Sequence, residues 1–181
     1  LKHNNQAILV TASKYLKLCY YIATNMRNLG KKIAILSRTS QIAGVDIAKF
    51  KNHLDKWIAY NEEIKPDIDV STIHSFKGLE AEVVILIEVI ATMFPLLHPD
   101  NSLFKILGRT KEDCIEEERR LFYVGITRAK SGLYILSEKS RISPYLQYDL
   151  NLTPTKPKAI FSRILTSDNK AENSESYPND E

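Results

Sequence analysis

Short apolar runs recur along the chain at the length of buried strands. In most of them apolar side chains fill consecutive positions rather than alternate ones, which is typical of strands covered on both faces. The run over residues 83–89, with VVILI inside it, is the strongest strand in the chain. The other predicted strands span residues 7–10, 33–36, 70–73 and 133–136.

Segments between these runs carry the apolar spacing of amphipathic helices. Leu16, Tyr20 and Ala23 recur at helical spacing, and Gly30 then ends the pattern as a helix C-terminal glycine would. The helices are predicted at residues 14–29, at residues 45–60, and after the irregular stretch 92–111, with the third closing on the basic sequence TRAK at 127–130.

Strands and helices therefore alternate along the chain. This alternation predicts an α/β fold of three layers, in which helices cover both faces of a parallel sheet. One such domain is predicted over residues 1–150. From Asn151 onward polar residues dominate and few large apolar side chains occur, so residues 151–181 are predicted to form a flexible tail.

Composition narrows the class of protein. The formal net charge of +3 is compatible with a phosphate-bearing partner without demanding one. Cys19 and Cys114 are far apart and fit no metal-ligand spacing, so reduced, buried thiols are predicted.

No apolar run approaches the roughly 18 residues of a membrane helix, and a soluble, cytoplasmic protein is predicted. Because the chain starts without methionine, directly before a strand, we expect a fragment of a longer polypeptide.

Candidate chemistry is expected where predicted strands end, because open α/β sheets bind ligands outside the carboxyl ends of their strands. Arg38 follows one strand and the segment from His74 to Glu80 follows another. Arg128 closes the third helix. Two arginines and a lysine are therefore expected to converge on one edge, where an arginine fork can bind phosphate oxygens bidentately.

Taken singly, each of these residues has a structural interpretation that remains open. For Arg38 that interpretation is a surface or structural residue, and for His74 it is a hydrogen-bonded structural histidine. Glu116 to Glu118 are expected to form a solvated first helical turn that pairs with Arg119 and Arg120 at helical spacing. Composition alone does not choose between a nucleotide phosphate and a nucleic-acid backbone.

Taken together, three segments resemble motifs of a known family in their order and wording. The segment STIHSFKGLE, residues 71–80, resembles motif V of the UvrD/Rep group of superfamily 1 helicases. The segment EERRLFYVGITRAK, residues 117–130, resembles motif VI, and IAILSRT, residues 33–39, resembles motif IV. The resemblance covers roughly residues 5–148 and identifies the second RecA-like lobe of such a helicase.

The resemblance implies roles for individual residues. Arg38 and Arg128 would contact the γ-phosphate of ATP across the cleft between two lobes. Glu80 would lie beside the nucleotide sugar and phosphates, with Lys77 and Gly78 shaping its loop. Two further residues, Thr72 and His74, would contact the backbone of single-stranded DNA.

The same resemblance implies partners outside this chain. No G-x-x-x-x-G-K-[ST] loop occurs in the sequence, so the N-terminal RecA-like lobe of the same parent chain is expected to hold ATP with Mg²⁺. The 181 residues alone are therefore predicted not to hydrolyse ATP.

Three departures from the family pattern accompany the resemblance. Only residues 41–69 separate motifs IV and V, where relatives usually carry a large inserted domain. Ser37 and Ala81 stand where the family tends to have aromatic residues. Two alternatives also stay open: a non-catalytic module that binds nucleic acid or a repair partner, and the corresponding lobe of an RNA helicase.

Overall fold

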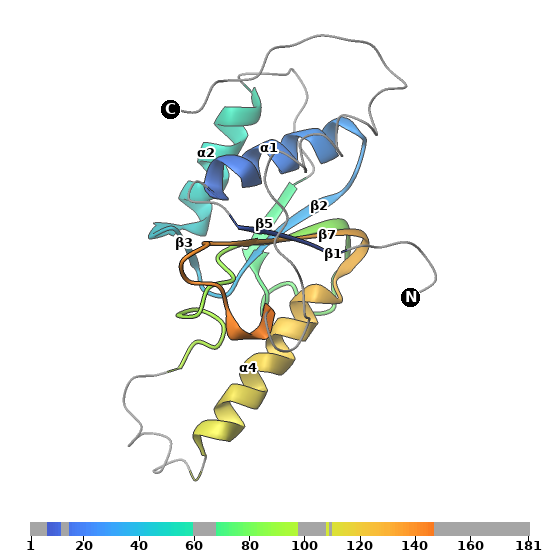
Figure 1. The fold of residues 1–181 in the computed structure, drawn as a ribbon. Helices are drawn as coiled ribbons and strands as arrows, with labels where there is room; N and C mark the ends of the chain where they lie inside the picture. Colours follow the sequence, from blue (N-terminus) through green and yellow to red (C-terminus); the bar gives the residue numbers. More distant parts are fainter. Residues whose placement is uncertain (1–6, 12–14, 60–67, 98–107, 109, 147–181) are drawn as a thin grey trace.

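A central parallel sheet organises the protein. The structure is a computed structural model that describes residues 7–11, 15–59, 68–97, 108 and 110–146. Five parallel strands are arranged in the order β1-β7-β6-β2-β5, so β1 lies at one edge, beside β7 (Figure 1). Their bounds are Ala7–Thr11 for β1, Ile33–Ser37 for β2, Ile68–Thr72 for β5, Ala81–Leu86 for β6 and Ala129–Ser137 for β7.

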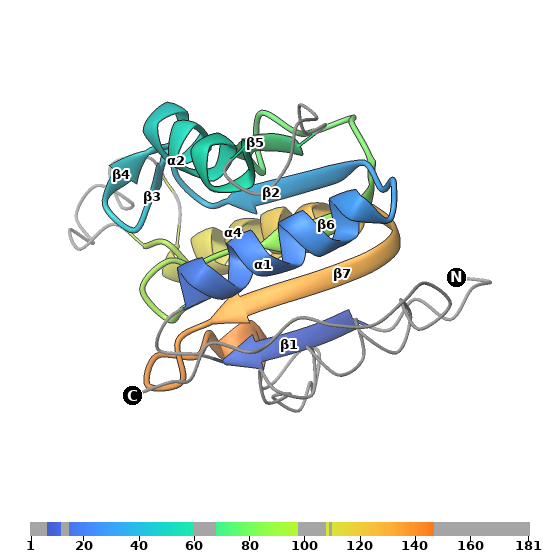
Figure 2. The same cartoon turned by 90° about the horizontal axis from the view of Figure 1, so that it is seen from above.

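Helices cover both faces of this sheet. Helices α1, Tyr15–Asn28, and α2, Ile47–Ala59, lie on one face, and α4, Lys111–Ile126, lies on the other (Figures 1 and 2). Successive strand residues alternate between two hydrophobic clusters: Ile33 and Ile35 pack under α1 and α2, and Ala34 and Leu36 pack toward α4. The predicted three-layer α/β fold is confirmed.

The second predicted helix begins two residues later than expected. A small hairpin precedes it, formed by β3, Gln41–Ile42, and β4, Val45–Asp46. Ala43 and Gly44 form its turn with φ of 50° and 74°. Two successive positive φ angles are typical of the tight two-residue turns that connect hairpin strands. The sequence pattern did not predict this hairpin, because alanine is unusual at a turn position with positive φ.

The strongest predicted strand ends earlier than its apolar run. Glu88 adopts a φ of 58°, in the left-handed region that breaks an extended backbone. Its buried carboxylate accepts hydrogen bonds from the Tyr15 hydroxyl at 2.8 Å and from the Ala43 amide at 2.9 Å. Glu88 thus ties the start of α1 and the small hairpin to the end of β6. Burial and this hydrogen bond raise the pKa of Tyr15.

Helix α4 approaches the sheet closely through a glycine. At Gly125, a Cβ atom would come within 3.1 Å of side-chain carbons of Ile73 and Leu86. The helix begins with a capping box: the Thr110 hydroxyl accepts from the Asp113 amide at 3.0 Å, and the Asp113 carboxylate accepts from the Thr110 amide at 2.8 Å. This cap fixes where α4 starts.

Two further predictions concern burial and membranes. Cys19 is fully buried as predicted, and burial raises the pKa of its thiol, whereas Cys114 is only half-buried on α4. Within the described ranges, no helix is long and apolar enough to cross a membrane. The predicted tail, residues 151–181, lies outside the described residues.

Candidate functional site

Arg128 lies just beyond the C-terminus of α4. Its guanidinium group donates to three neutral oxygens: the Val124 carbonyl at 3.0 Å, the Leu79 carbonyl at 3.4 Å and the Thr127 hydroxyl at 3.2 Å. No carboxylate among the described residues lies within ion-pair distance of Arg128. Its charge complements the dipole of α4, and no carboxylate of the described residues neutralises it.

The end of the motif V segment lies against Arg128. The Ala81 amide donates to the Arg128 carbonyl at 3.1 Å where β6 and β7 begin. Glu80 precedes Ala81, Lys130 lies two residues after Arg128, and the Lys130 ammonium and the Glu80 carboxylate are 3.1 Å apart. Both side chains are more than half exposed, so this ion pair contributes little stability and can rearrange at low cost. We call Glu80, Arg128 and Lys130 the amino-edge cluster.

Arg38 lies at the opposite edge of the sheet. It follows β2, whose Leu36 pairs with Leu86 at the end of β6, whereas Arg128 precedes Ala129, which pairs with Ala81 at the start of β6. The six residues of β6 span about 20 Å. The prediction that both arginines converge on one edge is therefore wrong, because α4 runs back across the sheet and delivers Arg128 to the amino edge.

A bidentate ion pair holds Arg38. Its guanidinium group donates to both carboxylate oxygens of Glu118, at 2.8 Å from Nε and 2.6 Å from Nη2. The two side chains are only 16% and 12% exposed. The Leu96 amide also donates to Glu118, at 3.1 Å, so one carboxylate joins β2, α4 and the loop after β6. This geometry gives Arg38 a structural role in the described conformation.

The prediction that Glu116 to Glu118 form a solvated first helical turn was wrong: all three residues lie beyond the first turn of α4, and the Glu118 side chain is mostly buried. The first turn of α4 carries Glu112 and Asp113, because Thr110 caps the helix earlier than expected, and Glu118 lies in its middle. The expected helical pairing is confirmed for Glu116, which accepts from Arg119 at 2.8 Å and lies 3.6 Å from Arg120.

The predicted nucleic-acid contacts follow β5 at the carboxyl edge. His74 is exposed there. The Thr72 hydroxyl is already engaged, accepting from the Ser75 amide at 3.1 Å and donating to the Ser75 hydroxyl at 2.9 Å. The side chains of Ile73 and Phe76 are buried in the hydrophobic cluster on the α4 side of the sheet and hold the loop against it.

The loop after β5 connects the two edges. It leaves the carboxyl edge at residue 73 and reaches the amino-edge cluster at residue 80. Lys77 and Gly78 are exposed on the way, and Gly78 adopts a φ of 87°, which a residue with a Cβ atom adopts only with strain. Predicted nucleotide and nucleic-acid residues thus occupy opposite ends of one short loop.

Three residues shape this site without being predicted as functional. Glu118 and Lys130 are ion-pair partners of predicted residues, 80 and 50 positions away in the chain. Ser37 is buried, and its hydroxyl donates to the Thr39 carbonyl at 2.6 Å, so it offers no surface to a base. Within the described part of the chain, no group of three or more His, Cys, Asp or Glu residues could hold a metal ion.

The sequence of this chain is similar to a known protein family and to several of its members. Residues 23–140 match the family described as the UvrD-like helicase C-terminal domain. The ATP-dependent DNA helicase Rep of Buchnera aphidicola is 35% identical over 108 residues, 60% of this chain and 14% of that protein. The ATP-dependent DNA helicase PcrA of Leuconostoc citreum is 41% identical over 81 residues, 45% of this chain and 10% of that protein.

One solved structure also resembles the fold. It is the C-terminal domain of a possible DNA helicase from Lactobacillus plantarum, with a TM-score of 0.47 and 15% identity over 80% of this chain and 79% of that one. In the sequence comparisons, the chain spans between a tenth and a seventh of the length of the Rep and PcrA helicases named above.

Proposed function

Because the chain belongs to the UvrD-like helicase C-terminal domain family, we propose that it is the C-terminal motor lobe of an ATP-dependent DNA helicase or translocase. The matched helicases are several times longer than this chain, so the first RecA-like lobe and its ATP-binding loop would lie elsewhere in the full-length protein. The Mg²⁺ that accompanies ATP would be held by that first lobe.

The observation that carries the proposal is the loop between β5 and β6. At one end, Thr72 and His74 would contact the backbone of single-stranded DNA, which contributes affinity without sequence choice. At the other, Glu80 would lie beside the nucleotide sugar, with Lys77 and Gly78 shaping the loop and Arg128 reaching the γ-phosphate. A loop fixed at both ligands would convert lobe closure on ATP into a movement along the strand.

Arg128 is the better placed of the two proposed γ-phosphate contacts. Its present partners are neutral oxygens, which a phosphate oxygen can replace without leaving a carboxylate unpaired. Arg38 is proposed as the second contact in the closed enzyme, and that role has two requirements. Arg38 must leave Glu118, and the two edges must be brought to the nucleotide from positions about 20 Å apart.

The isolated chain is expected to show no ATP hydrolysis above background. It supplies arginines for the transition state but no Gly-rich loop to bind the β- and γ-phosphates. The measurement is phosphate release with and without single-stranded DNA, with the full-length protein as the positive control. Turnover by the isolated chain that Arg128→Ala abolishes would contradict the two-lobe proposal.

His74→Ala in the full-length protein is expected to weaken binding of single-stranded DNA about tenfold, the loss of one charge-assisted or polar backbone contact of about 1.4 kcal/mol. The KM for ATP should change less than twofold, because His74 and Glu80 lie at opposite ends of the loop. Anisotropy of a labelled oligonucleotide and steady-state kinetics measure the two effects. A larger change in the KM than in DNA affinity would reverse the assignment of the loop ends.

A further inference from the structure

Positive charge is concentrated in the first third of the chain. Residues 1–59 contain ten lysines and arginines against two aspartates, a net charge of +8, and the remaining residues are net −5, which together give the +3 of the whole chain. Helices α1 and α2 carry five of these cations and one aspartate, whereas α4 carries three cations against five carboxylates. The two faces of the sheet are therefore covered by helices of opposite net charge.

One face of α2 carries a row of basic side chains that ends in an aromatic residue. Lys49, His53 and Trp57 are spaced four residues apart, so they lie on one face of the helix at intervals of about 6 Å. Lys56 borders this row, three residues beyond His53. All four side chains are exposed, and Trp57 keeps 45% of its surface in contact with solvent.

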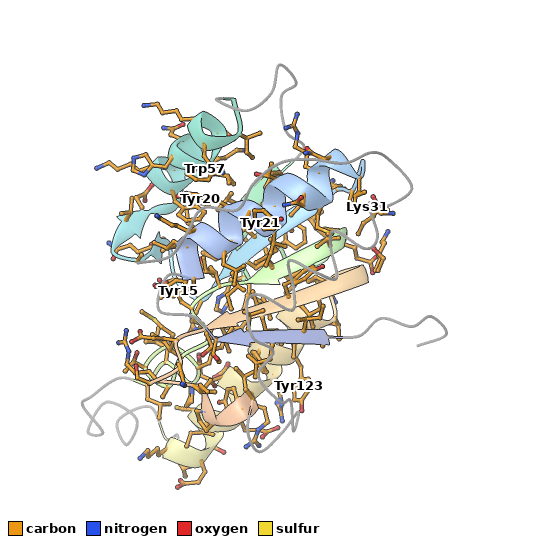
Figure 3. All side chains as sticks on the ribbon, turned by 45° about the horizontal axis from the view of Figure 1, so that its top comes forward. Tyr15, Tyr20, Tyr21, Lys31, Trp57 and Tyr123 are labelled. Carbon is orange, nitrogen blue, oxygen red and sulfur yellow. The ribbon has the colours of Figure 1, made fainter. Side chains whose placement is uncertain are left out.

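Tyr20 of α1 supports this row from the side. Its ring lies 5.4 Å from the ring of Phe50, which is buried, and 5.9 Å from the ring of Trp57, tilted by 45°. Figure 3 shows Tyr20 and Trp57 side by side where the two helices meet. Arg27 follows Tyr20 by two helical turns on α1. We call Tyr20, Arg27, Lys49, His53, Lys56 and Trp57 the basic aromatic surface.

We propose that the basic aromatic surface binds a segment of single-stranded nucleic acid, with its cations on phosphates and Trp57 stacked on a base. This inference rests on the proposed function, which brings a single strand to this lobe. The basic aromatic surface lies on helices α1 and α2, so it is a second site, separate from Thr72 and His74 at the carboxyl edge of the sheet. The strand would leave that edge and continue over the two helices.

The chemistry of the surface favours nucleic acid over an acidic protein segment. Lysines spaced along a helix attract either polymer, but a half-exposed tryptophan held by a second ring is a platform for stacking. Base–aromatic stacking contributes about 1–3 kcal/mol per base and tolerates any sequence. An acidic peptide would leave that apolar platform unused.

The chain provides its own probe, because Trp57 is its only tryptophan. Titration of the 181-residue chain with a twelve-nucleotide oligo(dT) at low salt is expected to quench Trp57 emission by stacking. Anisotropy of a labelled copy of the same oligonucleotide measures total binding in parallel. The double variant Lys49→Glu/Lys56→Glu is expected to bind at least tenfold more weakly, and its salt dependence should lose a slope of about 1.4, from two phosphate contacts.

Lys111→Glu/Arg120→Glu is the matched control, since it makes the same charge change on α4, across the sheet. It should bind like the unmodified chain and show the same quenching. Equal losses in both double variants would overturn the proposal, because they would show that only net charge matters. Oligonucleotide binding with unchanged Trp57 emission would overturn it as well.

Two other outcomes separate the second site from the proposed function. If His74→Ala abolishes oligonucleotide binding while Lys49→Glu/Lys56→Glu has no effect, the basic aromatic surface is excluded and the helicase lobe proposal stands. If a poly-glutamate peptide quenches Trp57 and oligo(dT) does not, the surface binds an acidic protein segment and the inference is wrong. Failure of the proposed function itself would appear in the ATPase of the full-length protein, which this titration does not measure.

Discussion

Arg128→Ala in the full-length protein is expected to lower kcat for ATP hydrolysis by on the order of 10³- to 10⁵-fold, the range for loss of an arginine that stabilises phosphoryl-transfer charge. The expectation follows from the position of Arg128 near Glu80 and from its guanidinium group, which among the described residues donates to neutral oxygens. DNA affinity without nucleotide should be unchanged, because Thr72 and His74 lie at the other edge.

Two further variants test whether the loss of rate comes from the missing Arg128 guanidinium group or from a loss of helix stability. Arg128→Lys keeps the charge but loses the planar fork, so it should recover only part of the rate. Arg120→Ala removes an arginine of α4, the helix that Arg128 follows; the Arg120 side chain is 78% exposed, and the kcat of this variant should match that of the unmodified enzyme. Single-turnover hydrolysis measures the chemical step. A kcat for Arg128→Ala within threefold of the unmodified value would exclude the arginine-finger role.

Arg38→Ala is expected to destabilise the chain by about 3 kcal/mol, the lower end of the cost of breaking a buried ion pair, because both side chains keep some exposure. Glu118→Ala should cost a similar amount and also orphan the Leu96 amide. Urea unfolding of the isolated chain measures both. The double variant Arg38→Met/Glu118→Leu should regain most of the loss, since it leaves no unpaired buried charge.

The same pair tests whether Arg38 also acts on ATP. In the full-length protein, measured well below the unfolding temperature of each variant, Arg38→Ala should lower kcat at least tenfold more than Glu118→Ala. Such a difference is expected only if Arg38 reaches the phosphate, because both variants lose the same ion pair. Equal kcat values would reduce Arg38 to the structural role that the ion pair already gives it.

Apolar patterning was enough to predict the layers of the fold. The consecutive apolar positions of β2 and β6 have no other stable placement than between two helical layers. Strand ends were harder to predict, because they depend on single backbone conformations. Glu88 ends β6 with a positive φ, although the apolar residues around it continue the pattern.

The candidate site was predicted in its residues but not in its geometry. Motif spacing carries no information on which edge of the sheet a segment reaches, so Arg128 was expected beside Arg38. The partners of both arginine-bearing segments are also long-range: Glu118 is 80 positions from Arg38, and Lys130 is 50 positions from Glu80. Such pairs depend on the register of α4 and β7 against the sheet, which only the folded chain establishes.

The pairing of β1 with β7 has a consequence for biosynthesis. Among the five strands of the described sheet, β1 is synthesised first and lies at the edge, and its neighbour β7 is synthesised more than 110 residues later, at Ala129–Ser137. Pairings of such high contact order form slowly, because a long loop must close before any contact compensates for the lost entropy. The β2, β5 and β6 strands can associate first, while β1 waits with unpaired amides until the final strand of the sheet emerges.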